Sequence, residues 1–158
     1  LGTSFCIRAF ENDTTIQVTV RTGKVSVSAH TDGKNRVGED AAGNPGEVIL
    51  APNQRLVYEK MAQKFQKVLL ENPVMTVPAD ADRNMVYEEA PLEKVFNAIA
   101  KAYDINIVYD NELLQHCTVT ADLRHEPFYR KLDLVCRAVG ATYEVIEGQV
   151  VIEAGGCN

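Results

Sequence analysis

The chain has 158 residues, of which 46% are hydrophobic and 24% are charged, and these values exclude a disordered or fibrous protein. No apolar run approaches the ~20 residues that a membrane-spanning helix needs. The net charge of −6 argues against a nucleic-acid-binding protein, which normally carries a basic face. The charge is also uneven, since residues 1–78 have a net charge of +1 and residues 79–158 a net charge of −7.

Short strands separated by turns fill the first half of the sequence. Alternating apolar residues predict strands, in chain order, at 5–9, 15–20, 25–28, 48–50, 56–58 and 65–70. Gly23 predicts a hairpin turn between the second and third strands, and Pro52-Asn53 predicts a turn between the fourth and fifth. Residues 32–46, rich in glycine, predict a loop. Such spacing suits a sandwich or a stacked β-solenoid, and we favour a truncated solenoid because a truncated sandwich would expose its core.

A change in composition marks a boundary near the middle of the chain. Pro73 and Pro78 disfavour regular pairing, and Asp80 and Asp82 favour solvent. We therefore predict an all-β segment at 1–72, a linker at 73–82 and a second domain at 83–158. The chain begins without a methionine, and a strand pattern follows at once, so we expect a fragment of a longer protein.

An internal repeat organises the second half. Helical periodicity runs from Pro91-Leu92 to Tyr103, and it returns 36 residues later from Pro127-Phe128 to Val139, with Gly140 as the stop. Pro91 is expected at the first helical position. Strands are predicted at 85–87, 105–109, 118–123, 142–146 and 150–152. The order is β-α-β-β-α-β-β in an α+β protein, and we expect both helices to cover a single small sheet, on one face or on opposite faces.

The residues that usually carry chemistry form no recognisable site, and we predict no catalytic residue, metal or cofactor. His30, His116 and His125 are few and scattered. Ser26 and Ser28 share a strand face with His30, but no acidic residue follows at a spacing that would complete a catalytic triad, and no nucleophile elbow is present. The four cysteines show no CxxC spacing, and Cys136 is expected as a buried free thiol on the apolar face of its helix. A solvated acidic face is expected at Asp80, Asp82, Asp110 and Glu112.

Several segments together resemble a known family. These are Leu-Gly-Thr-Ser-Phe-Cys-Ile-Arg-Ala-Phe at 1–10, Val-Thr-Val-Arg-Thr-Gly-Lys-Val-Ser-Val at 18–27 and Val-Ile-Leu-Ala-Pro-Asn-Gln-Arg-Leu-Val-Tyr at 48–58. They resemble the periplasmic part of FecR-type anti-sigma factors from Bacteroidetes-like bacteria. The second half is similar to the secretin/TonB short N-terminal (STN) domain, through Pro-Leu-Glu-Lys-Val-Phe at 91–96, Tyr-Asp-Ile-Asn-Ile-Val-Tyr-Asp at 103–110 and Cys-Thr-Val-Thr at 117–120. Cys6 departs from the polar residue expected there.

The resemblance implies a signal relay rather than an enzyme. In the family, a TonB-dependent outer-membrane receptor presents a periplasmic signalling domain to the anti-sigma factor, which controls an extracytoplasmic-function sigma factor. The resemblance also implies a periplasmic location for this part of the protein. The inner-membrane anchor and the N-terminal domain that binds the sigma factor, which the resemblance also implies, would lie outside this sequence. We hypothesise that the receptor domain docks by adding a strand to an exposed sheet edge, and the residues of that surface stay unassigned.

Two questions stay open at this point. In an oxidising periplasm, Cys117 and Cys157, both at strand ends, are candidates for a disulfide, and two unpaired exposed thiols are the alternative. The alternative function is that of a secretin-like ring component or a glycan-binding module. A ring component should self-associate, and a glycan binder should have a cleft lined by tyrosines.

Overall fold

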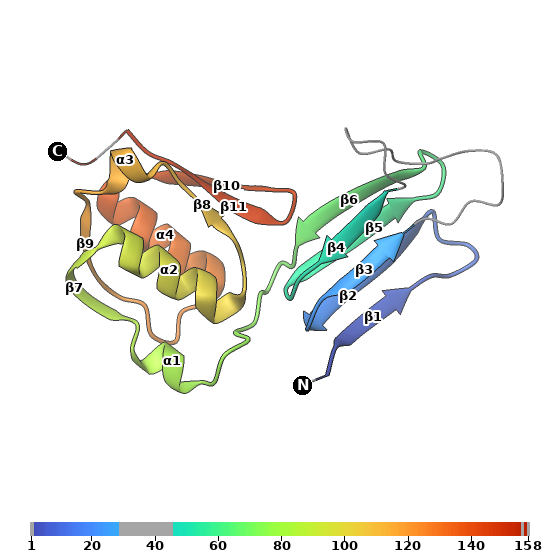
Figure 1. Ribbon diagram of the computed structural model, residues 1–158, viewed down its shortest axis with the longest axis horizontal. Helices are drawn as coiled ribbons and strands as arrows, with labels where there is room; N and C mark the ends of the chain where they lie inside the picture. Colours follow the sequence, from blue (N-terminus) through green and yellow to red (C-terminus); the bar gives the residue numbers. More distant parts are fainter. Residues whose placement is uncertain (1, 29–45, 156, 158) are drawn as a thin grey trace. The chain divides into compact units, whose positions relative to one another are not determined.

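The computed structural model describes residues 2–28, 46–155 and 157, and His30 and residues 32–45 of the predicted loop lie outside these ranges. The chain folds into two compact units, Leu1–Leu69 and Leu70–Asn158 (Figure 1). The fold is α+β, as predicted. The predicted limits 1–72, 73–82 and 83–158 stay a prediction. Thr76, within the predicted linker, donates its N–H to the Ala102 carbonyl of the second unit at 2.8 Å.

The described part of the first unit is built of antiparallel strands. A four-stranded sheet has the order β1-β2-β5-β6, and β3 and β4 form a separate pair. The strands are β1 (Ser4–Arg8), β2 (Thr15–Thr22), β3 (Val25–Ser28), β4 (Glu47–Leu50), β5 (Gln54–Glu59) and β6 (Lys64–Leu69). A small buried core joins the two sheets and consists of Val18, Val20, Leu50 and Leu56. Side chains alternate between the two faces of a strand, so the apolar residues of each strand lie on the face that packs into this core.

Two expectations for this unit need correction. The predicted hairpin between residues 15–20 and 25–28 is wrong, because β1 and β5 occupy both edges of β2, and β3 pairs instead with β4. Gly23 still supplies the turn, with φ of +76°, but the chain leaves the sheet there so that Val25 and Val27 pack over its core. The predicted solenoid is not confirmed, since the described strands pair antiparallel rather than as stacked parallel coils.

The second unit follows the predicted order of strands and helices, with two short helices in addition. The elements are α1 (Asp80–Arg83), β7 (Val86–Pro91), α2 (Leu92–Tyr103), β8 (Ile107–Val108), α3 (Asn111–Leu114), β9 (Thr118–Asp122), α4 (Phe128–Val139), β10 (Thr142–Ile146) and β11 (Gln149–Glu153). The short helices α1 and α3 were not predicted because four residues are too few to show a helical period. Within the described ranges, no helix is long and apolar enough to span a membrane.

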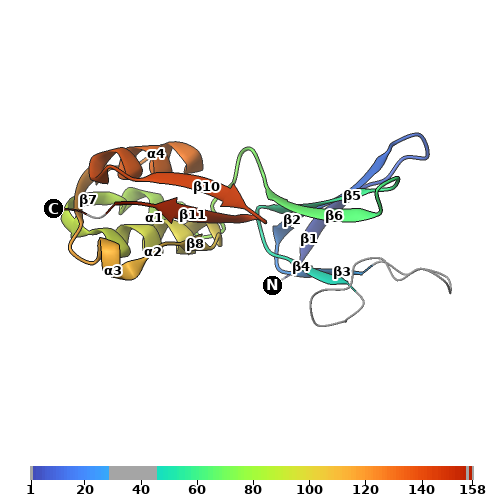
Figure 2. The same cartoon turned by 90° about the horizontal axis from the view of Figure 1, so that it is seen from above.

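The helices of the second unit lie between two sheets, so the expectation of a single sheet is wrong. One sheet has the order β10-β11-β8, and the other pairs β7 with β9. Helices α2 and α4 lie side by side, and each contacts one strand of each sheet (Figures 1 and 2). Each helix is therefore covered on more than one side, and Phe96, Ile99, Phe128 and Leu132 are fully buried.

The internal repeat is visible in the helices. Both have 12 residues, and they begin at Leu92 and Phe128, 36 residues apart. Pro91 and Pro127 precede the helices as their N-caps, so Pro91 lies one position earlier than predicted. Both helices end on a residue in the left-handed conformation, Asp104 with φ of 52° and Gly140 with φ of 67°.

Replacing Gly140 with alanine should destabilise the chain by about 1 kcal/mol, because a Cβ is disfavoured in the left-handed region. A Cβ at this position would meet no side chain within 4 Å, so the backbone conformation alone sets the cost. Asparagine at the same position should cost less, as it tolerates this conformation. Urea unfolding of the three proteins measures both differences, and an alanine variant as stable as wild type would contradict the expectation.

Candidate functional site

A buried lysine is the most unusual charged group of the second unit. Lys131 on α4 is fully buried, and its Nζ atom donates to Asp82 Oδ1 at 2.8 Å and to the Leu123 carbonyl at 2.6 Å. The other carboxylate oxygen of Asp82 accepts the backbone N–H of His125 at 2.8 Å. The cluster therefore ties α1, the end of β9 and the start of α4 together.

Sequence reasoning misses this cluster. The sequence places Asp82 on a solvated face, but its side chain is only 15% exposed, whereas the side chain of Asp80 is 83% exposed. The internal repeat could have indicated that Lys131 is buried, because it stands 36 residues after Val95, on the buried side of its helix. A lysine in a core position needs an anionic partner, and Asp82 supplies it.

The electrostatics of the cluster favour its ionised form. Partial burial acts to raise the pKa of Asp82, but the hydrogen bonds from Lys131 and His125 and their positive charges outweigh it, and the pKa lies below its ordinary value. Burial, together with the charge of Asp82, raises the pKa of Tyr103 to about 12. Lys131 and Asp82 each bind neighbouring groups of the fold, so the cluster is suited to stabilising the structure rather than to proton transfer.

The two candidate cysteines lie together in the structure. Cys117 and Cys157 are joined at an S–S distance of 1.98 Å, with their Cα atoms 5.3 Å apart. The Cα separation lies within the usual range for a disulfide. Cys117 is buried and its carbonyl accepts the N–H of Leu92, so the bond links the chain end after β11 to the base of α2.

The other two cysteines are free. Cys136 is buried on α4, as predicted, and burial followed by the nearby charge of Asp133 raises the pKa of its thiol to about 11. A thiol with so high a pKa is a poor nucleophile at neutral pH. Cys6 is exposed on β1.

The remaining sequence candidates do not assemble into a reactive centre. His116 is exposed, and the imidazole of His125 is 84% exposed, with Nδ1 3.5 Å from Asp82. Asp110 caps α3 by accepting the N–H groups of Glu112 and Leu113. Among the described residues, no three histidine, cysteine, aspartate or glutamate side chains are placed to hold a metal ion.

A free sheet edge is present at β10. Strand β10 pairs with β11 on one side and has no second neighbour among the described strands. Its side chains are mostly exposed, including Val145 at 40% and Ile146 at 46%. An edge strand presents backbone N–H and C=O groups that another strand can pair with, so β10 is a candidate docking edge.

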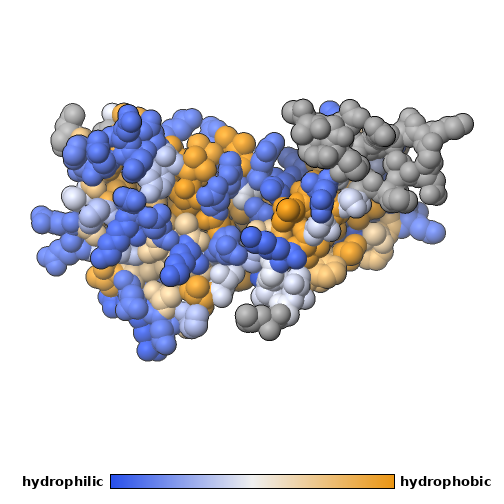
Figure 3. Space-filling model, viewed as in Figure 1, coloured by the Kyte–Doolittle hydropathy of each residue, from blue (hydrophilic) through white to orange (hydrophobic). Residues whose placement is uncertain are grey.

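The first unit also exposes apolar side chains at an edge. On β1, Phe5 lies opposite Val20 and Ile7 opposite Val18, which places them on the same face as the core. Strands β3 and β4 cover Val18 and Val20, but Phe5 and Ile7 remain 49% and 59% exposed. Figure 3 shows hydrophobic side chains on the surface over the strands of the first unit.

Residues 84–153 match the family described as FecR, C-terminal. The match supports the predicted family for these residues, which correspond to the C-terminal domain of FecR-type proteins. The matched residues run from just before β7 to the end of β11 and thus contain the whole repeat.

Two solved structures are similar to the chain. Both are crystal structures of a proposed anti-sigma factor from Parabacteroides distasonis, with sequence identities of 19% and 18% and a TM-score of 0.43 for each. Each alignment covers 99% of this chain and 66% of the other, so this chain spans just under two thirds of the length of those proteins. Among curated proteins, none matches the chain.

Proposed function

We propose that this chain works in anti-sigma factor signalling as the periplasmic receiving part of a protein anchored in the inner membrane. The observation that carries the proposal is the FecR C-terminal match over residues 84–153. In this proposal, the second unit binds the periplasmic signalling domain of a TonB-dependent outer-membrane receptor. The state of that complex then controls an extracytoplasmic-function sigma factor through the N-terminal domain of the full-length protein.

The architecture of the second unit supports a role in recognition. Its two strand–helix–strand repeats resemble an STN-like domain, and they surround a mostly apolar core in which the thiol of Cys136 has a raised pKa. The charged groups inside it, Lys131 and Asp82, are paired with each other. A relay of this kind needs a rigid binding surface and neither turnover nor a cofactor.

Strand addition at β10 is the proposed mode of docking. The partner strand would pair with the outer edge of β10 and extend the sheet β10-β11-β8 by one strand. Most of the affinity would come from main-chain hydrogen bonds, so side-chain truncation should matter little. Val145 and Ile146 would lose exposed apolar surface on docking.

Proline substitution on β10 tests both the partner and the mode. Successive N–H groups of a strand point to opposite edges of the sheet. One of the two variants Glu144→Pro and Val145→Pro therefore removes an N–H group on the outer edge of β10, and the other removes a hydrogen bond to β11. The variant that removes the N–H group on the outer edge should still fold, as measured by circular dichroism. It should lose binding to the signalling domain of the TonB-dependent receptor encoded by the neighbouring gene, as measured by isothermal titration calorimetry. The controls Glu144→Ala and Val145→Ala should bind within about threefold of wild type, a difference below 1 kcal/mol.

The outcomes separate the two parts of the proposal. If a folded proline variant binds as well as wild type, strand addition at β10 is wrong, but the relay stands. If the wild-type chain does not bind the receptor domain at all, the proposed function is wrong.

A further inference from the structure

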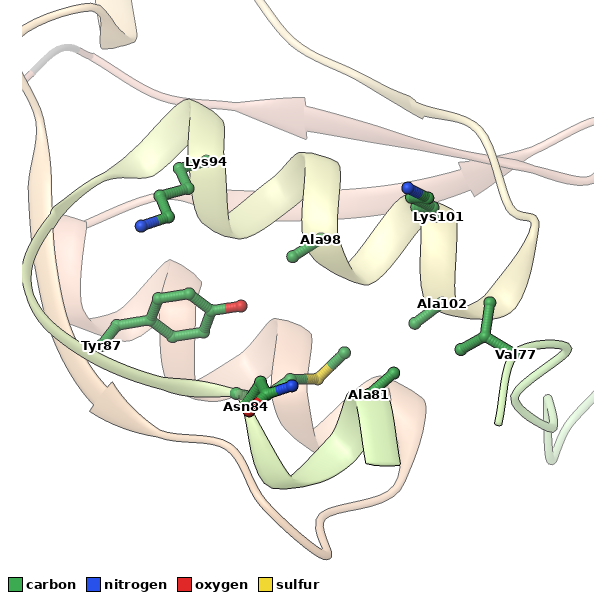
Figure 4. Close-up of a pocket in the computed structure, with 9 residues that line it drawn as sticks. Val77, Ala81, Asn84, Tyr87, Lys94, Ala98, Lys101 and Ala102 are labelled. Atoms are coloured by element: carbon green, nitrogen blue, oxygen red, sulfur yellow. The ribbon is translucent and has the colours of Figure 1, made fainter. Parts of the chain in front are cut away.

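A cavity of about 320 Å³ opens on the second unit beside α2 (Figure 4). Its walls are mostly apolar, with Met85, Ala98 and Ala102 among them. The residues come from α1 and the segments around it, from β7 and from one face of α2. Its size is at the lower end of ligand pockets and fits one or two side chains better than a large cofactor.

Tyr87 points its hydroxyl group into this cavity, as Figure 4 shows. The residue is only 7% exposed, and among the described residues its hydroxyl has no hydrogen-bond partner. Burial raises the pKa of Tyr87 above its ordinary value, so the phenol stays protonated at neutral pH and can donate. Within the described part of the chain, no buried side-chain nitrogen or oxygen atom lacks a hydrogen-bond partner, so solvent reaches the Tyr87 hydroxyl through the cavity mouth. A ligand that enters the cavity can accept this hydrogen bond in place of water.

Lys94 and Lys101 flank the cavity on the same face of α2, with Ala98 between them. Both are exposed, and neither forms an ion pair within the described part of the chain. They lie seven residues apart, which is about 10 Å along a helix axis. This pair of cations is notable in a half of the chain whose net charge is −7.

A second cavity, of about 610 Å³, offers a contrast. It is lined by Asp82, Tyr103 and His125, among others. The carboxylate of Asp82 is already bound by Lys131 and by the N–H of His125. The second cavity also includes Glu126 in its lining, whereas the cavity beside α2 has two lysines and a tyrosine hydroxyl and no carboxylate among its described lining residues.

We propose that the cavity beside α2 binds an acidic peptide segment of a partner protein, with an apolar side chain in the cavity and a carboxylate at each lysine. A peptide in the polyproline II conformation advances about 3.1 Å per residue and has three residues per turn, so two acidic residues three positions apart lie on one face and span roughly the distance between Lys94 and Lys101. The apolar side chain between them packs on Met85, Ala98 and Ala102, and a peptide carbonyl or carboxylate accepts from Tyr87. The inference rests on the proposed function for the identity of the partner, which is the receptor domain.

The internal repeat supplies a matched control. Arg130 and Arg137 stand on α4, 36 residues after Lys94 and Lys101, and both are exposed. The residue 36 positions after Tyr87 is Leu123, which carries no hydroxyl group. The double variant R130E/R137E therefore makes the same charge change at the same helical spacing, away from the tyrosine.

The test uses the full chain and a fluorescent peptide, Gly-Ser-Glu-Leu-Ser-Glu-Ser-Gly, at low salt. NMR should show the largest shifts in the amides of Lys94 to Ala102. K94E/K101E should abolish binding, R130E/R137E should leave it within about twofold, and Tyr87→Phe should weaken it about fivefold, which corresponds to one neutral hydrogen bond. A peptide with glutamine in place of both glutamates should not bind.

Other results would overturn the inference. The glutamine peptide could bind as well as the glutamate peptide, or K94E/K101E and R130E/R137E could lose peptide binding equally. The chain could also self-associate through contacts that K94E/K101E abolishes, and the occupant of the cavity would then be a second copy. The receptor domain is titrated in parallel. If it binds wild type and K94E/K101E alike, the inference fails and the proposed function stands; if the peptide binds as expected but the receptor domain does not, the proposed function fails.

Discussion

Replacing Asp82 with asparagine is expected to lower the free energy of unfolding by about 3–5 kcal/mol, because the positive charge of Lys131 would remain buried without a counter-charge. Lys131 is fully buried, and its other partner, the Leu123 carbonyl, is neutral. Asparagine keeps an oxygen that can accept the N–H of His125, so the substitution isolates the charge. Urea denaturation at pH 7 measures the change.

The lysine side of the pair should be far more tolerant. Lys131→Met places an apolar side chain where the repeat has Val95, and the carboxylate of Asp82 is left near solvent with the His125 N–H still bound. The double variant D82N/K131M should be within about 1 kcal/mol of wild type, as is common when apolar residues replace a buried ion pair. A double variant as unstable as Asp82→Asn would contradict the account.

The same pair predicts a dependence on pH. Because the pKa of Asp82 is lowered in the folded chain, its stabilisation is present above the ordinary carboxyl range and is lost as the pH falls through the folded pKa. The difference in stability between wild type and Asp82→Asn should thus be constant from about pH 5 to pH 8 and shrink below about pH 4.

Removing the disulfide by Cys157→Ser should destabilise the chain by roughly 4 kcal/mol in the chain-entropy model, since the bond joins residues 40 apart in sequence. Cys157 is the better position to change, because Cys117 is buried and its replacement would also disturb packing. Thermal unfolding measures the loss, and the reductant dithiothreitol should reproduce it in wild type but have no effect on the variant.

Mass spectrometry provides the direct check of the bond. Unreduced wild-type protein should be about 2 Da lighter than the reduced form, with Cys117 and Cys157 in one cross-linked peptide. Cys6→Ser, at an exposed free thiol, is the control and should leave stability unchanged. Alkylation of all four cysteines without reductant would exclude the pairing.

Local features of the fold were predictable from sequence, and long-range ones were not. Helices α2 and α4 could be located because apolar periodicity and a proline start agree in both, and Gly140 marks the end of α4. The partner of β3 could not, since a turn at Gly23 suggests pairing with β2 but does not reveal that β5 already occupies that edge. The division into two sheets depends on the same kind of distant pairing.

Predictability of the candidate sites follows the same pattern. Cys117 and Cys157 could be named together because strand ends are visible in sequence. Lys131 was missed because a lysine is ordinarily exposed, and only its tertiary contact with Asp82 makes the position tolerable. Tyr87 is a similar case, since nothing in its sequence neighbourhood indicates a hydroxyl directed into a cavity.

The way the repeat shares its strands has a consequence for its cooperativity. The first strands of the two copies, β7 and β9, pair with each other, whereas β8 and β10 from their far ends meet only through β11. Neither copy contains a complete sheet, so we expect neither half to fold as a stable fragment by itself. The two copies should therefore fold and unfold as one cooperative unit, and a mechanical force applied to a strand at one end should destabilise both copies.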